Sequence, residues 1–382
     1  MFLELRRAGV PFGVPLQVKG NTVGTSTSSA ALLGTGDVGE RSNFFCAGLL
    51  WQWYYDGTGN GLGYRTSADG KTWSSITYVS PTSASSPSGW DIYFDGTYVH
   101  YAAIKAASQP IYYRRGVPLS NGAVSWSAAE QTVVSGGSYI CVCVCADTFG
   151  YPLVSYVNAA NSYAYVIKSS TIDGTWSTKS GYPKQSHAQT PYKTLLLQLT
   201  QGKILLLYIP STAGDGGLDD EVLVNDALTG WQIVTQTAPN YSGSWSAVAV
   251  GDDVHLVSNE FNLGVYYVAY YKLTYATGSW SSVLAVVTGL PAIAFSPKIS
   301  CLGGADLAVF YANSDNYVYY VRKMGNTWDA KPSKLVNETS EVLSVYSEIS
   351  ASEKTYAGRT LLSWLGKSGS PYDIRFIQVA LI

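Results

Sequence analysis

Three acidic residues are the candidates for acid–base chemistry in this sequence: Asp91, Glu260 and Asp315. Hydrolysis of a glycosidic bond needs two carboxyl groups roughly 5 to 10 Å apart across the scissile bond. Asp91 begins the β-prone run DIYF, whereas Glu260 and Asp315 fall in polar stretches that follow β-prone runs. If the chain is a hydrolase, we expect Asp91 to act with one of the other two. If it is not, Asp91 simply caps the start of a strand.

One histidine, His187 in the segment SHAQTPY, lies outside the β-prone runs. It is the histidine best placed to act on a substrate, although a lone loop histidine is more often only solvent-exposed. Aromatic rings stack on the C–H face of a sugar, and amides and carboxylates bond to its hydroxyls. The residues expected to contact such a ligand are Trp90, Arg41, Gln189, Tyr192, Trp245, Asp315 and Tyr346.

The five cysteines give no sign of a metal centre or a disulfide framework. Three of them form the alternating run CVCVC at 141–145. Alternate residues of a strand share one side, but they lie too far apart to hold one tetrahedral zinc ion. Cys46 and Cys301 fall in comparable runs. We expect all five to be free thiols on inner strands, where cysteine acts as a small apolar residue. No metal and no cofactor are expected.

A repeated tryptophan indicates the framework that must position these residues. Each copy follows a turn and opens a short β-prone run, as in DGKTWSSITYV and TGSWSSVLAVV. A period near 50 residues in a strand-rich chain is typical of a β-propeller, with one four-stranded blade per repeat. The repeated residues are Trp73, Trp126, Trp176, Trp231, Trp280 and Trp328.

The strands of a blade can be lettered A to D from the axis outwards. The last unit, residues 343–382, supplies three β-prone runs but no fourth. The segment 8–20 aligns with a D strand, so we expect it to complete that last blade and close the ring. The sequence therefore predicts an all-β, seven-bladed propeller in a single domain, residues 1–382. Six blades with a separate N-terminal arm is the alternative.

Two turns carry a more specific signature. SADGKTW at 67–73 and STIDGTW at 170–176 resemble the Asp-box motifs of the sialidase-like (BNR repeat) propeller superfamily. The resemblance implies that Asp69 and Asp173 are structural residues of C–D turns. It also implies that ligands bind on the opposite face, formed by the D–A and B–C loops. The arginine triad and Arg-Ile-Pro signature of sialidases have no counterpart, so hydrolysis of sialic acid is not expected.

The segment 95–116 also resembles seven-bladed polysaccharide lyases, in which His100 would correspond to the catalytic base. However, His255 has the same offset from its own turn, GDDVHL against DGTYVH. A residue repeated at equivalent strand positions indicates packing rather than catalysis. The same reasoning applies to the cations repeated on the C strands, which are Arg65, Arg114, Arg115, Lys168, Lys272 and Arg322.

Charge and hydropathy limit the class of partner. The net charge is −2 with a pI of about 5.9 and only 13% charged residues, so a nucleic acid or an anionic membrane surface is not expected. No segment is apolar enough to span a bilayer, and the N-terminal MFLELRRAGVPFG has no apolar core typical of a secretory signal. We expect a glycan or polysaccharide as partner, and an extracellular, virion-surface or cell-surface location.

Three functions fit these observations. Glycan binding or adhesion through the axial loops is favoured, because no complete catalytic set can be assembled from the motifs. The first alternative is a glycoside hydrolase or polysaccharide lyase acting on neutral or uronic sugars. The second is a structural propeller that mediates protein assembly.

Overall fold

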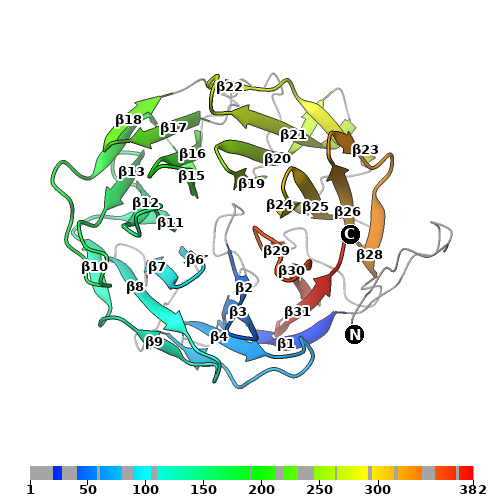
Figure 1. Ribbon diagram of the computed structural model, residues 1–382, viewed down its shortest axis with the longest axis horizontal. Helices are drawn as coiled ribbons and strands as arrows, with labels where there is room; N and C mark the ends of the chain where they lie inside the picture. Colours follow the sequence, from blue (N-terminus) through cyan, green and yellow to red (C-terminus); the bar gives the residue numbers. More distant parts are fainter. Residues whose placement is uncertain are drawn as a thin grey trace.

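Short β-prone runs separated by Gly-containing turns fold into antiparallel sheets arranged in a ring. In the computed structural model, seven such sheets surround a central axis (Figure 1). This confirms the prediction of an all-β, seven-bladed propeller and rules out six blades. The structure describes residues 20–27, 41–57, 61–79, 89–104, 110–189, 191–210, 219–230, 245–262, 265–290, 295–313, 317–337, 349–366 and 370–381.

Blades 1 to 6 run in chain order from an inner strand, A, to an outer strand, D, whereas blade 7 takes its outer strand from the N-terminal part of the chain. We call the side of the ring with the B–C and D–A connections the loop face, and the opposite side the turn face. Blade 1 consists of β2 (Asn43–Cys46), β3 (Leu49–Tyr55), β4 (Leu62–Ser67) and β5 (Thr77–Tyr78). Blade 2 consists of β6 (Trp90–Phe94), β7 (Val99–Ile104), β8 (Ile111–Pro118), β9 (Val124–Trp126) and β10 (Gln131–Val134). Blade 3 consists of β11 (Tyr139–Ala146), β12 (Pro152–Asn158), β13 (Tyr163–Lys168) and β14 (Lys184–Gln189).

The outer strand is split into two short pieces in blades 2, 5 and 6. Blade 4 consists of β15 (Pro191–Gln198), β16 (Ile204–Pro210), β17 (Asp219–Val224) and β18 (Ala227–Gly230). Blade 5 consists of β19 (Trp245–Val250), β20 (Asp253–Asn262), β21 (Val265–Thr274), β22 (Ser279–Trp280) and β23 (Leu284–Leu290). Blade 6 consists of β24 (Phe295–Gly303), β25 (Asp306–Ala312), β26 (Tyr317–Met324), β27 (Thr327–Trp328) and β28 (Ser333–Asn337). Blade 7 consists of β29 (Ile349–Ala351), β30 (Thr360–Gly366), β31 (Tyr372–Val379) and β1 (Asn21–Ser26).

An N-terminal strand closes the ring. β1 pairs antiparallel with β31, so that the first described strand is the outer strand of the last blade (Figure 1). Gly20, just before β1, is packed so closely that a Cβ atom there would lie 2.5 Å from Cζ2 of the buried Trp364. Of the segment predicted to close the ring, residues 8–19 lie outside the described residues. The strand found in that role begins at Asn21.

The repeated tryptophans take equivalent positions at the C–D corners, and the five described ones are half-buried. Three of them lie edge-on against an aromatic ring on the C strand of the preceding blade, with ring centroids 5.0 to 5.1 Å apart. These contacts are Trp73 with Phe376, Trp176 with Tyr113, and Trp328 with Tyr270. The indole therefore joins neighbouring blades instead of filling the centre of its own. Trp231 lies outside the described residues.

The cysteines lie on inner strands, as expected from the sequence: Cys46 on β2, Cys301 on β24, and the other three on β11. All five are free. Cys143 and Cys145 are buried, whereas Cys141 is only half-buried and has a positive φ of 50°. The pairing of β11 with β12 shifts at this point, so Cys141 lies in a bulge. The strict alternation expected for CVCVC therefore holds only for Cys143 and Cys145.

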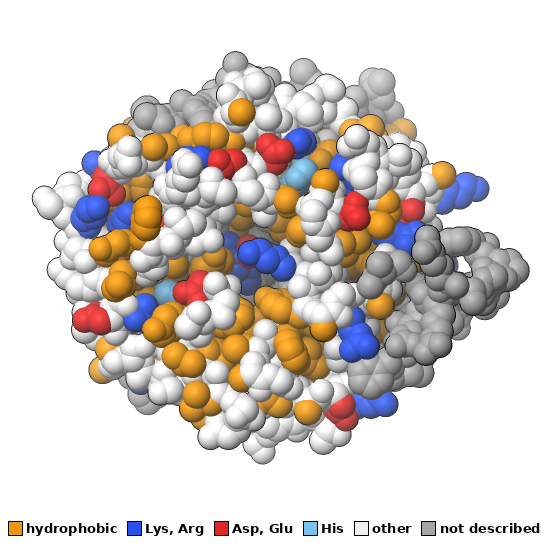
Figure 2. All heavy atoms as spheres, in the orientation of Figure 1, with side chains coloured by type: hydrophobic (Ala, Val, Ile, Leu, Met, Phe, Trp, Pro, Cys, Tyr) orange, Lys and Arg blue, Asp and Glu red, His pale blue; other side chains and the backbone are white. Residues whose placement is uncertain are grey.

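One face of the ring is hollowed at its centre. Figure 2 shows basic side chains at this hollow and hydrophobic side chains over blades 1 and 2 in the lower part of the view. Within the described ranges, no helix is long and apolar enough to cross a membrane.

Candidate functional site

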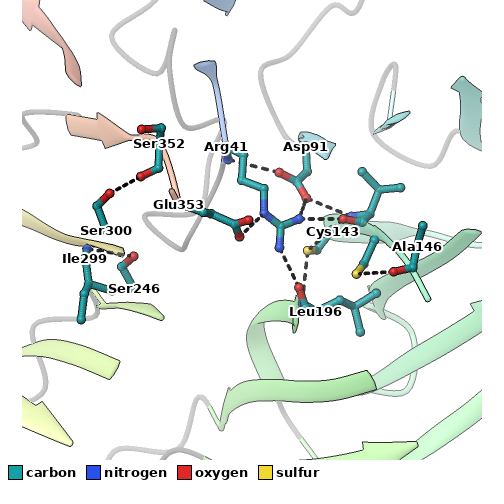
Figure 3. Close-up of polar contacts among 12 residues, drawn as sticks. Arg41, Asp91, Cys143, Ala146, Leu196, Ser246, Ile299, Ser300, Ser352 and Glu353 are labelled. Atoms are coloured by element: carbon teal, nitrogen blue, oxygen red, sulfur yellow. Dashed lines mark hydrogen bonds and ion pairs between the residues drawn. The ribbon is translucent and has the colours of Figure 1, made fainter. Parts of the chain in front are cut away.

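The axis of the ring is occupied by the side chain of Arg41, which lies two residues before the inner strand of blade 1 (Figure 3). Arg41 is only 6% exposed. Its Nε donates to Oε1 of Glu353 at 2.6 Å, and its Nη1 to Oδ2 of Asp91 at 3.3 Å. The two remaining bonds go to the carbonyl oxygens of Val144 and Leu196, each at 2.7 Å. The guanidinium thus contacts blades 2, 3, 4 and 7.

Asp91, the second residue of β6, is 1% exposed and bonded on both oxygens. Oδ1 accepts from the backbone N–H of Arg41 at 3.2 Å, and Oδ2 accepts from that of Val144 at 2.9 Å. Burial raises the pKa of the Asp91 carboxyl, and the charge of Arg41 opposes that rise. The carboxylate is therefore held in an ion pair in the inner wall of the ring.

The network continues through Cys143, whose Sγ accepts from the backbone N–H of Leu196 at 3.3 Å. Burial raises the pKa of the Cys143 thiol well above its usual value, so this sulfur is a neutral thiol. The sequence indicated Arg41 and Asp91 as separate site residues, but it gave no signal for Glu353. That residue is recognisable only through its bond to Arg41 in the folded ring.

Glu260, on β20 of blade 5, is also buried, but its carboxylate is enclosed by hydroxyl groups of its own blade. Its Oε1 accepts from Ser258 Oγ at 3.0 Å and from the hydroxyl of Tyr271, and its Oε2 accepts from the hydroxyl of Tyr267 at 2.7 Å. Burial, followed by the bond to Glu260, raises the pKa of Tyr267. Among the described residues, Glu260 and Asp91 share no bonding partner.

The other residues singled out in the sequence are distributed as follows. Trp90 and Trp245 begin inner strands and are 3% and 1% exposed. The indole N–H of each has no partner among the described residues. His187, Gln189 and Tyr192 lie on β14 and β15, either side of the D–A connection from blade 3 to blade 4; only their backbone course is described. Asp315 and Tyr346 lie outside the described residues.

The two repeated histidines share the contact on their Nδ1 atoms, and His100 also bonds to Asp95 through Nε2 at 3.0 Å. His100 Nδ1 and the Tyr113 hydroxyl are 2.8 Å apart, and His255 Nδ1 and the Tyr270 hydroxyl are 2.7 Å apart. Both rings are buried, and burial lowers the pKa of each. Tyr113 and Tyr270 are the same tyrosines that receive a repeated tryptophan from the next blade. The shared offset thus reflects a repeated packing contact, and His100 is not accessible as a catalytic base.

The two Asp-box-like turns lie between the C and D strands of blades 1 and 3, on the turn face. Oδ1 of Asp69 accepts from the backbone N–H groups of Lys71 and Thr72 at 2.8 and 2.9 Å. These bonds, that of Thr72 first, lower the pKa of Asp69 to about 2. Oδ1 of Asp173 accepts from both the N–H and the hydroxyl of Thr175. Both carboxylates therefore shape turns.

The cations of the C strands also brace these corners. Arg65 donates to the carbonyl of Ser74, and Arg114 to that of Ala128. Arg322 forms an ion pair with Asp329 at 3.0 Å. Each partner lies one or two residues after a repeated tryptophan, so these side chains hold the start of the outer strand.

No protein-family model and no curated protein matches this sequence. Among solved structures, the polysaccharide lyase Uly1 is similar over 98% of this chain and 94% of that chain, with a TM-score of 0.55 and 10% identity. AofleA from Arthrobotrys oligospora is similar over 85% of this chain and 96% of that chain, with a TM-score of 0.51 and 12% identity. At these identities the likeness shows the propeller fold alone.

Proposed function

We propose that this protein is a carbohydrate-binding propeller whose ligand lies on the loop face, around the mouth of the axis. The proposal is supported by the start points of the inner strands. Arg41 lies two residues before β2, Trp90 and Asp91 begin β6, and Trp245 begins β19. His187 and Gln189 near the end of β14, and Tyr192 near the start of β15, flank the D–A connection on the same face. In this proposal the buried Trp90 and Trp245 pack below the loops around the axis. His187, Gln189 and Tyr192 contact the sugar.

The observation that favours binding over hydrolysis is the Arg41–Asp91 ion pair. A glycosidase needs one carboxyl group to donate a proton and a second to act as base or nucleophile. Asp91 is committed to Arg41 and to the N–H of Val144, and Glu353 is bonded to the same guanidinium. Because the charges of this axial network are paired, the mouth suits a neutral, hydroxyl-rich ligand. We expect modest affinity, since a shallow polar site gains little beyond desolvation.

Glycoside hydrolysis is the second candidate, and one observation favours it. Arg41 brings two carboxyl groups, Asp91 and Glu353, to one guanidinium at the axis, and burial raises the pKa of Asp91. Two carboxyl groups at one site, one of them with a raised pKa, resemble the acid and its partner in a glycosidase. The Glu353 side chain is 26% exposed and lies in the A–B connection of blade 7, on the turn face.

We also propose descent from the sialidase-like superfamily and a location where glycans are displayed, such as a cell or virion surface. The bonding of Asp69 and Asp173 within their turns supports the first of these. The polysaccharide acted on by Uly1, a protein with the same fold, supports a carbohydrate as the ligand class.

A glycan array probed with the full chain, combined with a screen on chromogenic glycosides, tests the proposal. We expect binding without turnover, and weaker binding after Gln189→Ala or Tyr192→Ala. Asn121→Ala, which removes an exposed amide from a turn on the opposite face, is the matched control and should bind as the parent does. If no glycan binds at about 10 mM, the carbohydrate proposal fails and an assembly role becomes the better one.

The same screen separates binding from hydrolysis. Turnover of any glycoside that is lost in Glu353→Gln, with binding retained, would establish the hydrolase instead. Glu353→Gln is preferable to Asp91→Asn for this purpose, because Asp91 is fully buried and its replacement is more liable to unfold the ring.

A further inference from the structure

On the loop face of blade 3, away from the axis, three side chains form a fixed polar corner. We call Asn161, Tyr165 and Gln185 the blade-3 corner. Asn161 Nδ2 donates to the Tyr165 hydroxyl at 2.7 Å, and that hydroxyl donates to Gln185 Oε1 at 3.0 Å. Asn161 and Gln185 are exposed and Tyr165 is half-buried. The amide, hydroxyl and amide thus form one chain of bonds along the surface.

The local backbone holds this chain in place. The B–C connection of blade 3 is a tight turn in which Asn158 Oδ1 accepts from the N–H of Ala160, and the Asn158 carbonyl accepts from that of Ser162. Asn161 Oδ1 accepts from the N–H of Tyr163 at 3.3 Å, which orients the amide so that its NH₂ group points to Tyr165. The geometry of the corner is therefore set before any ligand arrives.

A ladder of aromatic rings supports the corner from below. Tyr165 stacks on Tyr156, with centroids 5.5 Å apart and an interplanar angle of 14°, and Tyr156 meets Tyr139 edge-on at 5.2 Å. Tyr139 and Tyr156 are buried in the main hydrophobic core. The ladder crosses β11, β12 and β13, so the exposed edge of Tyr165 is anchored to the rigid centre of its blade.

The direction of these hydrogen bonds determines which N–H groups of the blade-3 corner are left to donate to a ligand. Because Gln185 accepts through its oxygen, its NH₂ group is left to donate outwards, and it has no partner among the described residues. The second N–H of Asn161 is likewise uncommitted there. Bonds aligned head to tail polarise one another, which strengthens the terminal donor. Neither an ammonium nor a carboxylate takes part in the chain of bonds.

We infer that the blade-3 corner is a second binding site, separate from the axial mouth, for a neutral saccharide. Neutral amide donors match sugar hydroxyl oxygens, and the half-buried ring of Tyr165 offers apolar surface to the C–H face of a pyranose. An exposed chain of this kind adds little to folding, since water competes for each of its bonds. Its fixed geometry is explained by a ligand. The ligand class is the one proposed for the axis, but the residues are different.

Saturation-transfer NMR with defined oligosaccharides tests this inference on the full chain. The probes are maltohexaose, cellohexaose and xylohexaose, with hexagalacturonate as the charged comparison. We expect at least one neutral probe to bind, and Gln185→Ala, Asn161→Ala and Tyr165→Phe each to weaken its binding about three- to tenfold, as the loss of one hydrogen bond does. Asn121→Ala, on the opposite face, is the control and should leave binding unchanged. Unaltered melting temperatures would show that the variants are folded.

The outcomes separate this site from the axial one. Binding that survives the three corner variants but falls in Tyr192→Ala supports the axial proposal and overturns the corner; Gln189→Ala is not used here, because Gln189 pairs with Tyr163 beside the corner. Binding that falls only in the corner variants supports the corner and counts against the axis. The inference also fails if no neutral probe binds at about 10 mM, or if hexagalacturonate is the probe that the corner variants affect.

Discussion

Trp176 lies edge-on against Tyr113 of the preceding blade, with the ring centroids 5.1 Å apart and the planes at 61°. On its other side, the hydroxyl of Tyr113 bonds to the buried His100. Blades 5 and 6 repeat this arrangement with Tyr270, which bonds to His255 and receives Trp328. At these two junctions the tyrosine thus links a blade to its successor.

Replacing Trp176 with alanine should lower the free energy of unfolding by about 2–3 kcal/mol. This is less than a fully buried tryptophan would cost, because the indole is only half-buried. Urea denaturation measures the loss. Val283→Ala, at an exposed position on the rim, is the control and should change stability by no more than about 0.5 kcal/mol. Equal losses in the two variants would show that the tryptophan does not join the blades.

Gly20→Ala should weaken the closure of the ring, since its Cβ would overlap the indole of Trp364. We expect a loss of about 1–3 kcal/mol in urea denaturation, as for other overpacked sites. In a double-mutant cycle with Trp364→Leu, the double variant should lose less than the sum of the single variants, because the smaller side chain makes room. Strict additivity would contradict the contact.

Arg41→Met should be among the most damaging substitutions in the protein. It leaves Asp91 and Glu353 without their common cation, and removal of one partner from a buried pair costs about 3–5 kcal/mol. The combined variant Arg41→Met, Asp91→Leu should be more stable than Arg41→Met alone, since no buried charge is then left unpaired. Arg114→Met, at the surface of blade 2, serves as the control. If the two arginine variants unfold at the same urea concentration, the axial network does not stabilise the ring.

Acid should destabilise the protein partly through His255. Burial lowers the pKa of His255 to about 4 from an ordinary value of 6.5. Below pH 6.5 His255 binds a proton in the unfolded chain, whereas in the folded protein it does so only near pH 4. The free energy of unfolding is therefore highest above pH 6.5 and falls as the pH drops through this window. At pH 5 the expected contribution is about 2 kcal/mol. His255→Gln should lose correspondingly less stability between pH 7.5 and pH 5, and parallel curves would refute the assignment.

Thiol titration should divide the five cysteines into two groups. After denaturation without reductant we expect five reactive thiols. In the folded protein Cys143 and Cys145 should be protected, because both are buried and burial raises the pKa of Cys145 to about 12. Cys46, Cys141 and Cys301 are half-buried and should react first. Rapid reaction of all five in the native state would contradict the packing of β11.

The sequence was sufficient to predict the ring but not the contents of its axis, and the reason is the range of the interactions. Trp73 and Trp328 occupy the same place in units of nearly constant length, so their register is visible in the chain itself. Arg41 and Glu353 are 312 residues apart, and no local pattern links them. The bulge at Cys141 could not be predicted either, because the alternating sequence CVCVC does not indicate that one residue has a positive φ.

The pairing of β1 with β31 also has a consequence for the order of events during synthesis. Asn21–Ser26 is synthesised about 350 residues before its partner Tyr372–Val379. At 5–20 residues per second, translation keeps the early strand waiting for roughly 20 to 70 seconds. During that interval β1 has no partner strand, and the ring cannot close. A chaperone that covers the unpaired strand until β31 emerges would therefore assist folding.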